Sequence, residues 1–242
     1  LAKYDSNGNE LWVTGISPSA TGGLGNESSN SVCTDVSGNV FVTGGFSSSF
    51  IPFGSFVLTN TSTSGSDIFI AKFDGSGNPL WAKSAGGTGW EESVSVSTDL
   101  AGNFFVTGYF YSPTIIFGST TLNNSDPSGN TTDLFLAKYD ANGNLIWAQS
   151  ADGYGASVSS DASGNVFLTG NFSSSSISLG STTLANTGGT DFFIAKYDPN
   201  GNVLWAKSAG GNDEDLGYSV STDGLGNVYL TGYFNSSAIT FG

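Results

Sequence analysis

Residues 219–232 read Ser-Val-Ser-Thr-Asp-Gly-Leu-Gly-Asn-Val-Tyr-Leu-Thr-Gly, and similar stretches end at Gly44, Gly108 and Gly170. Each stretch contains two short runs that favour β-strands, joined by Asp-x-x-Gly-Asn. An Asp at the start of such a turn can accept backbone N–H bonds from the residues just ahead, and Gly supplies the positive φ that a short hairpin loop needs. The stretch therefore predicts a β-hairpin in four copies.

A second motif, Ala-Lys-(Tyr/Phe)-Asp followed by Gly-Asn and a Trp, alternates with the first; it begins at Ala2, Ala71, Ala137 and Ala195. Its Asp opens the same turn, so eight turns of one design begin at Asp5, Asp35, Asp74, Asp99, Asp140, Asp161, Asp198 and Asp223. A third landmark, Phe-x7-Gly, follows the first motif, at Phe46/Gly54, Phe110/Gly118, Phe172/Gly180 and Phe234/Gly242. Such repetition indicates one supersecondary unit used four times.

Each unit predicts four strands, which we name strands a to d in chain order: Ser-Val-Ser-Thr, Val-Phe-Val-Thr-Gly, Phe-Ile-Ala-Lys-Tyr and Leu-Trp-Ala-Lys. In strand c of the last copy, Phe192 and Ile194 point to one face, whereas Phe193 and Ala195 point to the other. A sheet with two apolar faces must be covered on both, as propeller blades are by their neighbours. Strand a, rich in small serines, is the best candidate for lining the axis.

We therefore predict an all-β fold, a β-propeller of four-stranded antiparallel blades with four repeat units, over residues 1–242 as a single region. Strands c and d of one blade occupy 1–15, full blades about 31–84, 93–150 and 157–208, and strands a and b of a last blade 219–234. The two half-blades could close a four-bladed ring, but units cut within a repeat favour a fragment of a larger propeller. A β-solenoid or sandwich is the competing fold, and the number of hairpins argues against it.

These motifs resemble the bacterial SBBP β-propeller repeat, whose blades read like Ser-Ile-Ala-Val-Asp-x-x-Gly-Asn-x-Tyr-Val-Thr-Gly followed by Asp-x-Phe-Val-Ala-Lys. The matching stretches are 219–232 and 191–196, and comparable ones recur along nearly the whole chain. The resemblance implies a secreted or surface-attached bacterial protein without catalytic residues that could be carried over. The chain departs from it in number, because that family is usually described as seven-bladed.

Charge and composition exclude several functions. The formal net charge is −14, with six lysines and no arginine, so the chain cannot neutralise a row of phosphates, and neither nucleic acid nor an anionic membrane is an expected partner. No apolar run is long enough to insert into a membrane. Cys33 is the single cysteine, which excludes an internal disulfide, and we expect it to be a small strand residue.

Catalysis is not expected. The chain has no histidine, so Ser-His-Asp, Cys-His and His-ligated zinc sites are unavailable. A glycosidase needs only two carboxylates and remains an alternative. However, eleven of the twenty acids are repeat positions, namely the eight turn Asp residues and Asp67, Asp133 and Asp191. We predict no catalytic residues and no required cofactor.

Calcium is the one cofactor that the sequence suggests at all. The turns at Asp5, Asp140 and Asp198 read Asp-x-Asn-Gly-Asn, like the first part of an oxygen-rich calcium loop. They lack the later bidentate acid, and turns with Ser or Ala in place of the middle Asn form the same hairpins. Turn chemistry is therefore the favoured interpretation.

The loops from strand d to strand a differ most between copies, at 15–30, 84–92, 150–156 and 208–217. Loops on a rigid scaffold can vary without disturbing it, so a ligand site is expected there. The candidate ligand-binding residues are Trp90, Glu91, Glu92, Tyr154, Asp213, Glu214 and Asp215, which combine aromatic rings with carboxylates and suit a sugar or a cation. Alternatively, Glu27, Glu91 and Asp215, at matching positions, only brace the loop, and Trp90 only covers a blade edge.

The function that the sequence favours is a non-catalytic binding or display module, extracellular or at the cell surface, that takes part in adhesion through a glycan or another surface protein. A structural stalk of propeller repeats is the alternative from another class.

Overall fold

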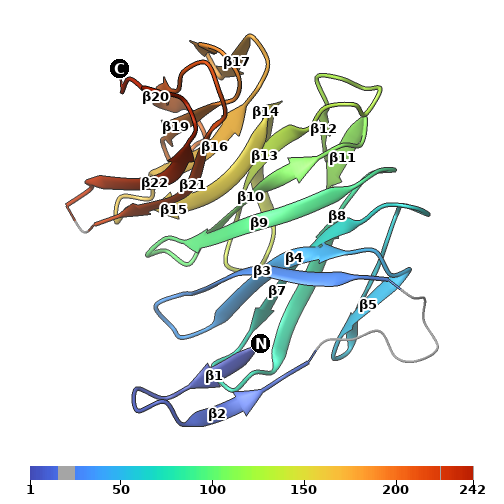
Figure 1. Cartoon of the computed structure of the whole chain (residues 1–242). Coiled ribbons are helices and arrows are strands. Elements are labelled where there is room, and N and C mark those ends of the chain that lie inside the picture. The colour runs from blue at the N-terminus through green and yellow to red at the C-terminus, as the bar shows by residue number, and fades with distance from the viewer. Residues whose placement is uncertain (16–24, 224, 242) are drawn as a thin grey trace.

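The computed structural model describes residues 1–15, 25–223 and 225–241, which contain twenty-two β-strands and no helix (Figure 1). Three antiparallel four-stranded sheets form the centre, and we call them blades 1, 2 and 3. Their strand orders are β3 (Glu27–Thr34), β4 (Val40–Phe46), β7 (Asp67–Phe73), β8 (Pro79–Ala85); β9 (Glu91–Thr98), β10 (Phe104–Phe110), β13 (Asp133–Tyr139), β14 (Leu145–Asp152); and β15 (Tyr154–Ser160), β16 (Val166–Phe172), β19 (Asp191–Tyr197), β20 (Val203–Ala209). The predicted all-β architecture of four-stranded antiparallel blades is confirmed.

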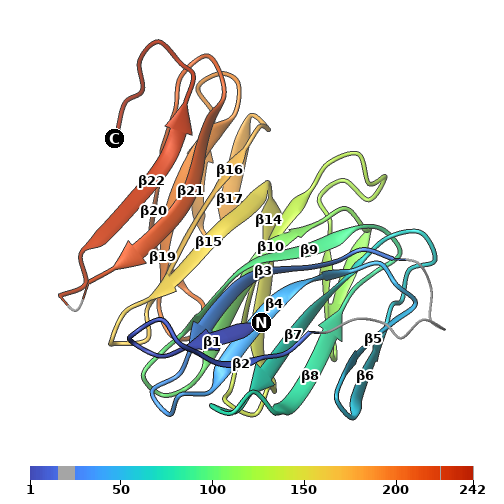
Figure 2. The ribbon, with the colours of Figure 1, turned by 60° about the horizontal axis from the view of Figure 1, so that its bottom comes forward.

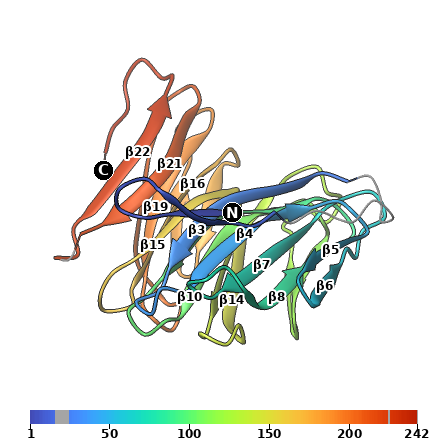
Figure 3. The ribbon, with the colours of Figure 1, turned by 90° about the horizontal axis from the view of Figure 1, so that it is seen from below.

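A half-blade lies at each end of the row of blades. β1 (Ala2–Tyr4) pairs with β2 (Glu10–Val13), and β21 (Asp215–Thr222) pairs with β22 (Val228–Phe234). The two half-blades lie apart, and among the described residues no pairing joins β1 to β22 (Figures 1 and 2). Seen from below, the blades form an open fan (Figure 3). The structure therefore does not show the ring closure that the strand count allowed.

Each full blade carries an additional hairpin between strands b and c that we did not predict. The three hairpins are β5–β6 (Phe50–Phe53, Phe56–Thr59), β11–β12 (Thr114–Phe117, Thr120–Asn123) and β17–β18 (Ser176–Leu179, Thr182–Ala185). Gly54, Gly118 and Gly180 turn them with φ near +60°, so the Phe-x7-Gly landmark marks this turn; the fourth copy, Gly242, lies outside the described residues. The hairpin also joins blades, because the Ile116 N–H donates to the Gly86 carbonyl of the preceding blade (3.0 Å).

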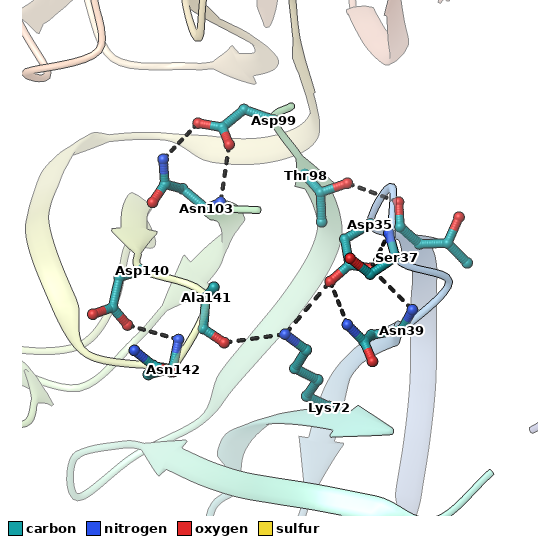
Figure 4. Close-up of polar contacts among 11 residues, drawn as sticks. Asp35, Ser37, Asn39, Lys72, Thr98, Asp99, Asn103, Asp140, Ala141 and Asn142 are labelled. Atoms are coloured by element: carbon teal, nitrogen blue, oxygen red, sulfur yellow. Dashed lines mark hydrogen bonds and ion pairs between the residues drawn. The ribbon is translucent and has the colours of Figure 1, made fainter. Parts of the chain in front are cut away.

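The eight Asp turns have one geometry, which Asp35 illustrates (Figure 4). Its Oδ1 accepts the backbone N–H groups of Ser37 (3.0 Å) and Asn39 (2.9 Å), and its Oδ2 accepts the Asn39 side-chain amide (2.7 Å). The Gly of the turn, Gly38, has φ +79°. Every turn repeats these three bonds, which confirms the role predicted for Asp and Gly and explains the Asn that follows.

Apolar side chains from adjacent blades form shared cores, as the two-sided apolar pattern predicted. Between blades 1 and 2, Phe41 of β4 packs on Phe104 of β10 with ring centroids 5.0 Å apart, and Trp81 of β8 stacks on the same Phe104 at 5.5 Å. Cys33 packs against this core, where burial raises the pKa of its thiol to about 12. This placement fits the small structural residue that we expected.

The first strands of the blades, β3, β9, β15 and β21, lie side by side (Figure 1). Small hydroxyl side chains join them, because Ser31, Ser95 and Ser157 accept the backbone N–H groups of Val96, Val158 and Val220 at 3.1–3.2 Å. These N–H groups lie on the free edge of each blade and would otherwise lack a partner. Strand a is therefore the innermost strand, as predicted.

Strand a begins earlier than predicted, at 27, 91, 154 and 215 instead of 31, 93, 157 and 219. Much of the expected variable loop is therefore strand. Between β14 and β15 a single residue, Gly153, makes the connection at φ +123°. Residues 16–24 of the first loop lie outside the described residues.

Two of the repeated lysines are enclosed between blades. Lys72 and Lys138 are buried, and their ammonium groups donate to the Ala141 (3.1 Å) and Pro199 (2.9 Å) carbonyls in the next blade. Lys72 also lies 3.5 Å from the Asp35 carboxylate (Figure 4). The lysine thus closes the junction between blades at the end where the Asp turns lie.

The repeated Trp residues should differ in their contribution to stability. Trp81 packs against both Phe41 and Phe104, whereas Trp205 is 37% exposed and makes an edge contact with Phe167 at 6.2 Å. We expect Trp81→Ala to lower the free energy of unfolding by about 3–5 kcal/mol and Trp205→Ala by clearly less, as measured by urea denaturation.

Trp81→Phe is the matched control. Within the described part of the chain the Trp81 indole N–H has no hydrogen-bond partner, so a ring without it should retain most of the stability. Equal losses for Trp81→Ala and Trp205→Ala would contradict this account of the core.

Candidate functional site

One end of the innermost strands combines a constant backbone with variable side chains. At Gly44, Gly108, Gly170 and Gly232 of the strands b, an added Cβ would collide with the carbonyl oxygen of Ser28, Glu92, Tyr154 or Leu216 in strand a. Glycine therefore permits a close approach that no other residue allows. Next to it each strand a has a β-bulge, at Asn30, Val94, Ala156 and Tyr218. A bulge re-aims a side chain and is common beside functional sites.

Three positions per blade differ around this constant backbone, and we call them the rim. They are the bulged residue and the strand a–strand b pair beside it: Asn30 with Ser28/Gly45, Val94 with Glu92/Tyr109, Ala156 with Tyr154/Asn171, and Tyr218 with Leu216/Tyr233. The Ser after the bulge in strand a and the Gly and Phe of strand b are the same in all four units, whereas the position before the bulge is Ser in two units and Gly in two. The blades therefore carry different side chains at positions where their backbone conformation is the same.

Rim side chains fill the junction between blades 1 and 2. Glu92 reaches across to blade 1, where its Oε1 accepts the Ser28 hydroxyl (2.6 Å) and the Asn30 side-chain amide. The absence of a side chain at Gly45 leaves room for this carboxylate, which lies where a Cβ would be. The acid therefore joins two blades as well as charging the rim.

The junction between blades 2 and 3 is filled by aromatic rings. Tyr109 and Tyr154 stack with centroids 4.7 Å apart, and Tyr111 meets Tyr109 edge-on at 6.1 Å. Burial, together with the nearby Tyr154 and Glu92, raises the pKa of Tyr109 to about 12. The Tyr109 phenol therefore stays neutral at physiological pH.

The junction between blade 3 and the C-terminal half-blade is open. A pocket of about 420 Å³ lies there, lined by Val94, Tyr154, Ala156, Asn171, Glu214, Leu216, Gly217 and Tyr218. Two of the predicted ligand-binding residues, Tyr154 and Glu214, line this pocket. Tyr218, Asn171 and Tyr109 were missed by the sequence analysis, although the variable residue between constant Gly and Phe in strand b was a readable signal for two of them.

Two predicted ligand-binding acids have a different role. Glu91 and Asp215 are fully buried. Glu91 accepts the Gly87 N–H (3.0 Å) and the Ser112 hydroxyl, and Asp215 accepts the Ser236 hydroxyl (2.8 Å). Because these bonds fix the start of strand a, we remove both acids from the candidate ligand surface and assign them the bracing role that was the alternative.

The remaining predicted residues lie at the surface. Trp90 is 55% exposed, and its carbonyl accepts the Tyr111 N–H (2.9 Å), which holds it beside the rim at blade 2. Asp213 is exposed, next to Glu214 but outside the pocket lining. The seven candidates therefore do not form one site.

The calcium candidates Asp5, Asp140 and Asp198 each use both carboxylate oxygens within their own turn, in the three-bond pattern of Asp35. These bonds lower the pKa of Asp5 and Asp198, most through the Asn side chain. Within the described ranges no group of three or more His, Cys, Asp or Glu residues is placed to hold a metal ion. The turn role is directly observed, and calcium binding at these turns, which was the less favoured interpretation, is untested.

An apolar hollow of about 380 Å³ lies between the C-terminal half-blade and Phe192 of blade 3. It contains Phe234, which is 59% exposed although its counterparts Phe46, Phe110 and Phe172 are buried. In the full blades this Phe packs against strand c and the inserted hairpin of its own blade, as Phe172 does against Phe193. The described part of the half-blade has neither element. None of the described residues belongs to a helix long and apolar enough to cross a membrane.

Two known proteins are similar to this chain in sequence. An uncharacterized WD repeat-containing protein of Acanthamoeba polyphaga mimivirus is 23% identical over a 301-residue alignment that covers the whole chain and 21% of that protein. Regulatory protein FlaEY of Caulobacter vibrioides is 30% identical over 140 residues, which cover 57% of the chain and 14% of that protein. No protein-family model matches the chain. The blades and the WD repeat relative together indicate a β-propeller-like repeat protein, and membership of the SBBP family stays a prediction.

Glu91 should make stability depend on pH. Burial, against the Ser112 and Gly87 bonds, raises its pKa from 4.5 to about 7. Between these two pKa values the folded state binds more protons than the unfolded state. The contribution of Glu91 to the free energy of unfolding therefore falls as the pH rises from about 4.5 to about 7. We expect Glu91→Gln, which mimics the protonated acid, to lose less stability than wild type between about pH 5 and about pH 8 in urea denaturation.

The control is Glu92→Gln, which removes the adjacent carboxylate on the same strand and should keep the wild-type difference between the two pH values. An unchanged difference in Glu91→Gln would show that Glu91 does not titrate in this window.

The turns should be indifferent to calcium. Because Asp140 is satisfied by its own turn, we expect the melting temperature to be the same in calcium and in chelator, and Asp140→Ala to lower it equally in both. A rise with calcium that disappears in Asp140→Ala would instead establish the calcium site.

Proposed function

We propose that this chain is a non-catalytic binding module that holds its ligand at the rim. The observation that carries the proposal is the divergence of three rim positions per blade on a backbone that is otherwise repeated. Side chains that differ from blade to blade at one end of the axis, on a backbone that is the same in each blade, have the form of a recognition surface.

A structural stalk is the rival function. A spacer needs no distinctive groups, whereas here one junction is filled by a carboxylate, the next by stacked rings, and the third contains a pocket. The similarity to the WD repeat-containing protein of the mimivirus supports a repeat protein that serves as a binding module. The name of that relative does not state a function.

A glycosidase is the rival among enzymes. It would need a general acid of raised pKa and a second carboxylate, both within reach of substrate. Glu91 has the raised pKa, but it is fully buried and bonded to Ser112. Asp67 and Asp133, whose pKa values are also raised by burial, are equally enclosed. These placements favour binding over hydrolysis.

The place of action that we propose is outside the cell or at the cell surface of a bacterium, where the module takes part in adhesion through a glycan or another surface protein. The resemblance to SBBP repeats and the acidic composition with a single cysteine support this part of the proposal. Recovery of the full-length protein from the cytoplasm on fractionation would contradict it.

Variants at the rim and directly beside it test the binding function. We expect the wild-type chain to bind at least one class of glycan on a panel, and Trp90→Ala or Tyr154→Ala to weaken that binding by about fivefold or more, because an aromatic platform contributes about 1 kcal/mol or more. Tyr229→Ala is the matched control, since Tyr229 is exposed on β22 near the Asp223 turn, away from the rim.

If Trp90→Ala, Tyr154→Ala and Tyr229→Ala all bind the glycan as tightly as the wild-type chain does, the ligand site lies away from the rim. Binding to no glycan and to no purified surface protein would favour the stalk.

A further inference from the structure

The open junction differs from its neighbours by particular residues. At the junction of blades 2 and 3, Tyr109 of strand b stacks on Tyr154 of the following strand a. At the next junction the corresponding pair is Asn171 and Leu216, which are smaller and cannot stack. Both line the pocket of about 420 Å³, which is of a size that can take a small organic group.

The pocket lining has three chemical parts. Val94, Ala156 and Leu216 supply apolar surface, Tyr154 and Tyr218 supply aromatic rings, and Glu214 supplies a carboxylate; Asn171 adds an amide. Tyr218 is placed there by its bulge and is 57% exposed, and Glu214 is exposed as well. Apolar surface and aromatic faces beside a negative charge are the elements with which proteins bind alkylated ammonium groups.

The distribution of charge favours a cation further. Burial raises the pKa of Tyr154, and the nearby Glu92 carboxylate contributes to the rise, which is the sign of negative potential at this ring. The lysines Lys72 and Lys138 are buried at the opposite end of the blades, on the carbonyls of the Asp turns. None of the residues that line the pocket is cationic.

We propose that the pocket between Tyr154 and Tyr218 binds the alkylated ammonium group of an organic cation, with Glu214 as its counter-charge. The proposal rests on the binding function proposed above and names the chemistry of the ligand at one junction of the rim. The alkyl groups of the cation contact Val94, Ala156 and Leu216, and the positive charge lies against the tyrosine rings and the carboxylate.

Choline is the probe, and 3,3-dimethylbutan-1-ol, which has the same shape without the charge, is its neutral counterpart. We expect choline to bind the wild-type chain at least about tenfold more tightly than the alcohol in ligand-observed NMR titrations, because a ring–cation contact and a carboxylate both require the charge. Tyr218→Ala and Glu214→Gln should each weaken choline binding by about three- to tenfold, and Tyr218→Phe should retain it.

Matched controls separate the site from the general acidity of the chain. Asp213→Asn removes the neighbouring exposed carboxylate outside the lining, and Tyr229→Ala removes an exposed ring of the same half-blade; both should bind choline as wild type does. Methyl glycosides form a third arm for a sugar at the same pocket.

Equal binding of choline and the alcohol would overturn the proposal and leave a purely apolar pocket. So would choline binding that survives both Tyr218→Ala and Glu214→Gln. A methyl glycoside that binds in place of choline, with loss in Tyr218→Ala, would overturn the cation while leaving the rim as a binding surface. If choline does not bind, while a glycan or a protein binds in a way that depends on Trp90, the cation proposal is overturned and the proposed binding function stands.

Discussion

The structure depends on one constraint, that each blade is apolar on both faces and is covered by the next. Phe41 of blade 1 and Phe104 of blade 2 belong to one core, and no blade could bury its apolar residues alone. The polar features at the two ends of the strands follow from this packing. At one end Lys72 and Lys138 donate to carbonyls in the next blade, and along the axis serine hydroxyls accept N–H groups from the adjacent strand a.

The same constraint decides where the chain is free to vary. Residues of strands b and c are enclosed between blades, so a change of volume there would be felt by two sheets. The bulge beside Gly108 or Gly170 instead lies at the rim, where side chains such as Glu92 contact only a few residues of the neighbouring blade. A junction can therefore be filled by Glu92, stacked with Tyr154 or left open without altering the backbone that carries it.

Much of the fold could be read from the sequence, because its turns are local. Asp35, Gly38 and Asn39 specify a hairpin by bonds among themselves, and eight copies of that pattern gave the blade strands and their order. The inserted hairpins were missed because their turn glycine, such as Gly54, has no companion Asp. The candidate site was predicted only in part, since the pocket depends on which residues of two blades meet, as Asn171 and Leu216 do, and on the burial of Glu91, which the sequence alone does not reveal.

Only part of the negative charge of the chain is accessible to a ligand, because many of the acidic side chains are used by the fold itself. The formal charge of −14 includes the eight turn Asp residues, whose carboxylates are used by their own backbone, and the buried Asp67, Asp133 and Asp191 that lead into the strands c. Glu91 and Asp215 are likewise fixed inside the fold. The charge that a ligand at the rim can meet therefore comes from a few side chains, Glu92 and Glu214 among them. The turns and these buried positions together hold thirteen of the twenty acids, so the acidic composition is mainly a property of the fold. The residues that recognise a ligand are expected among those that differ between the repeats.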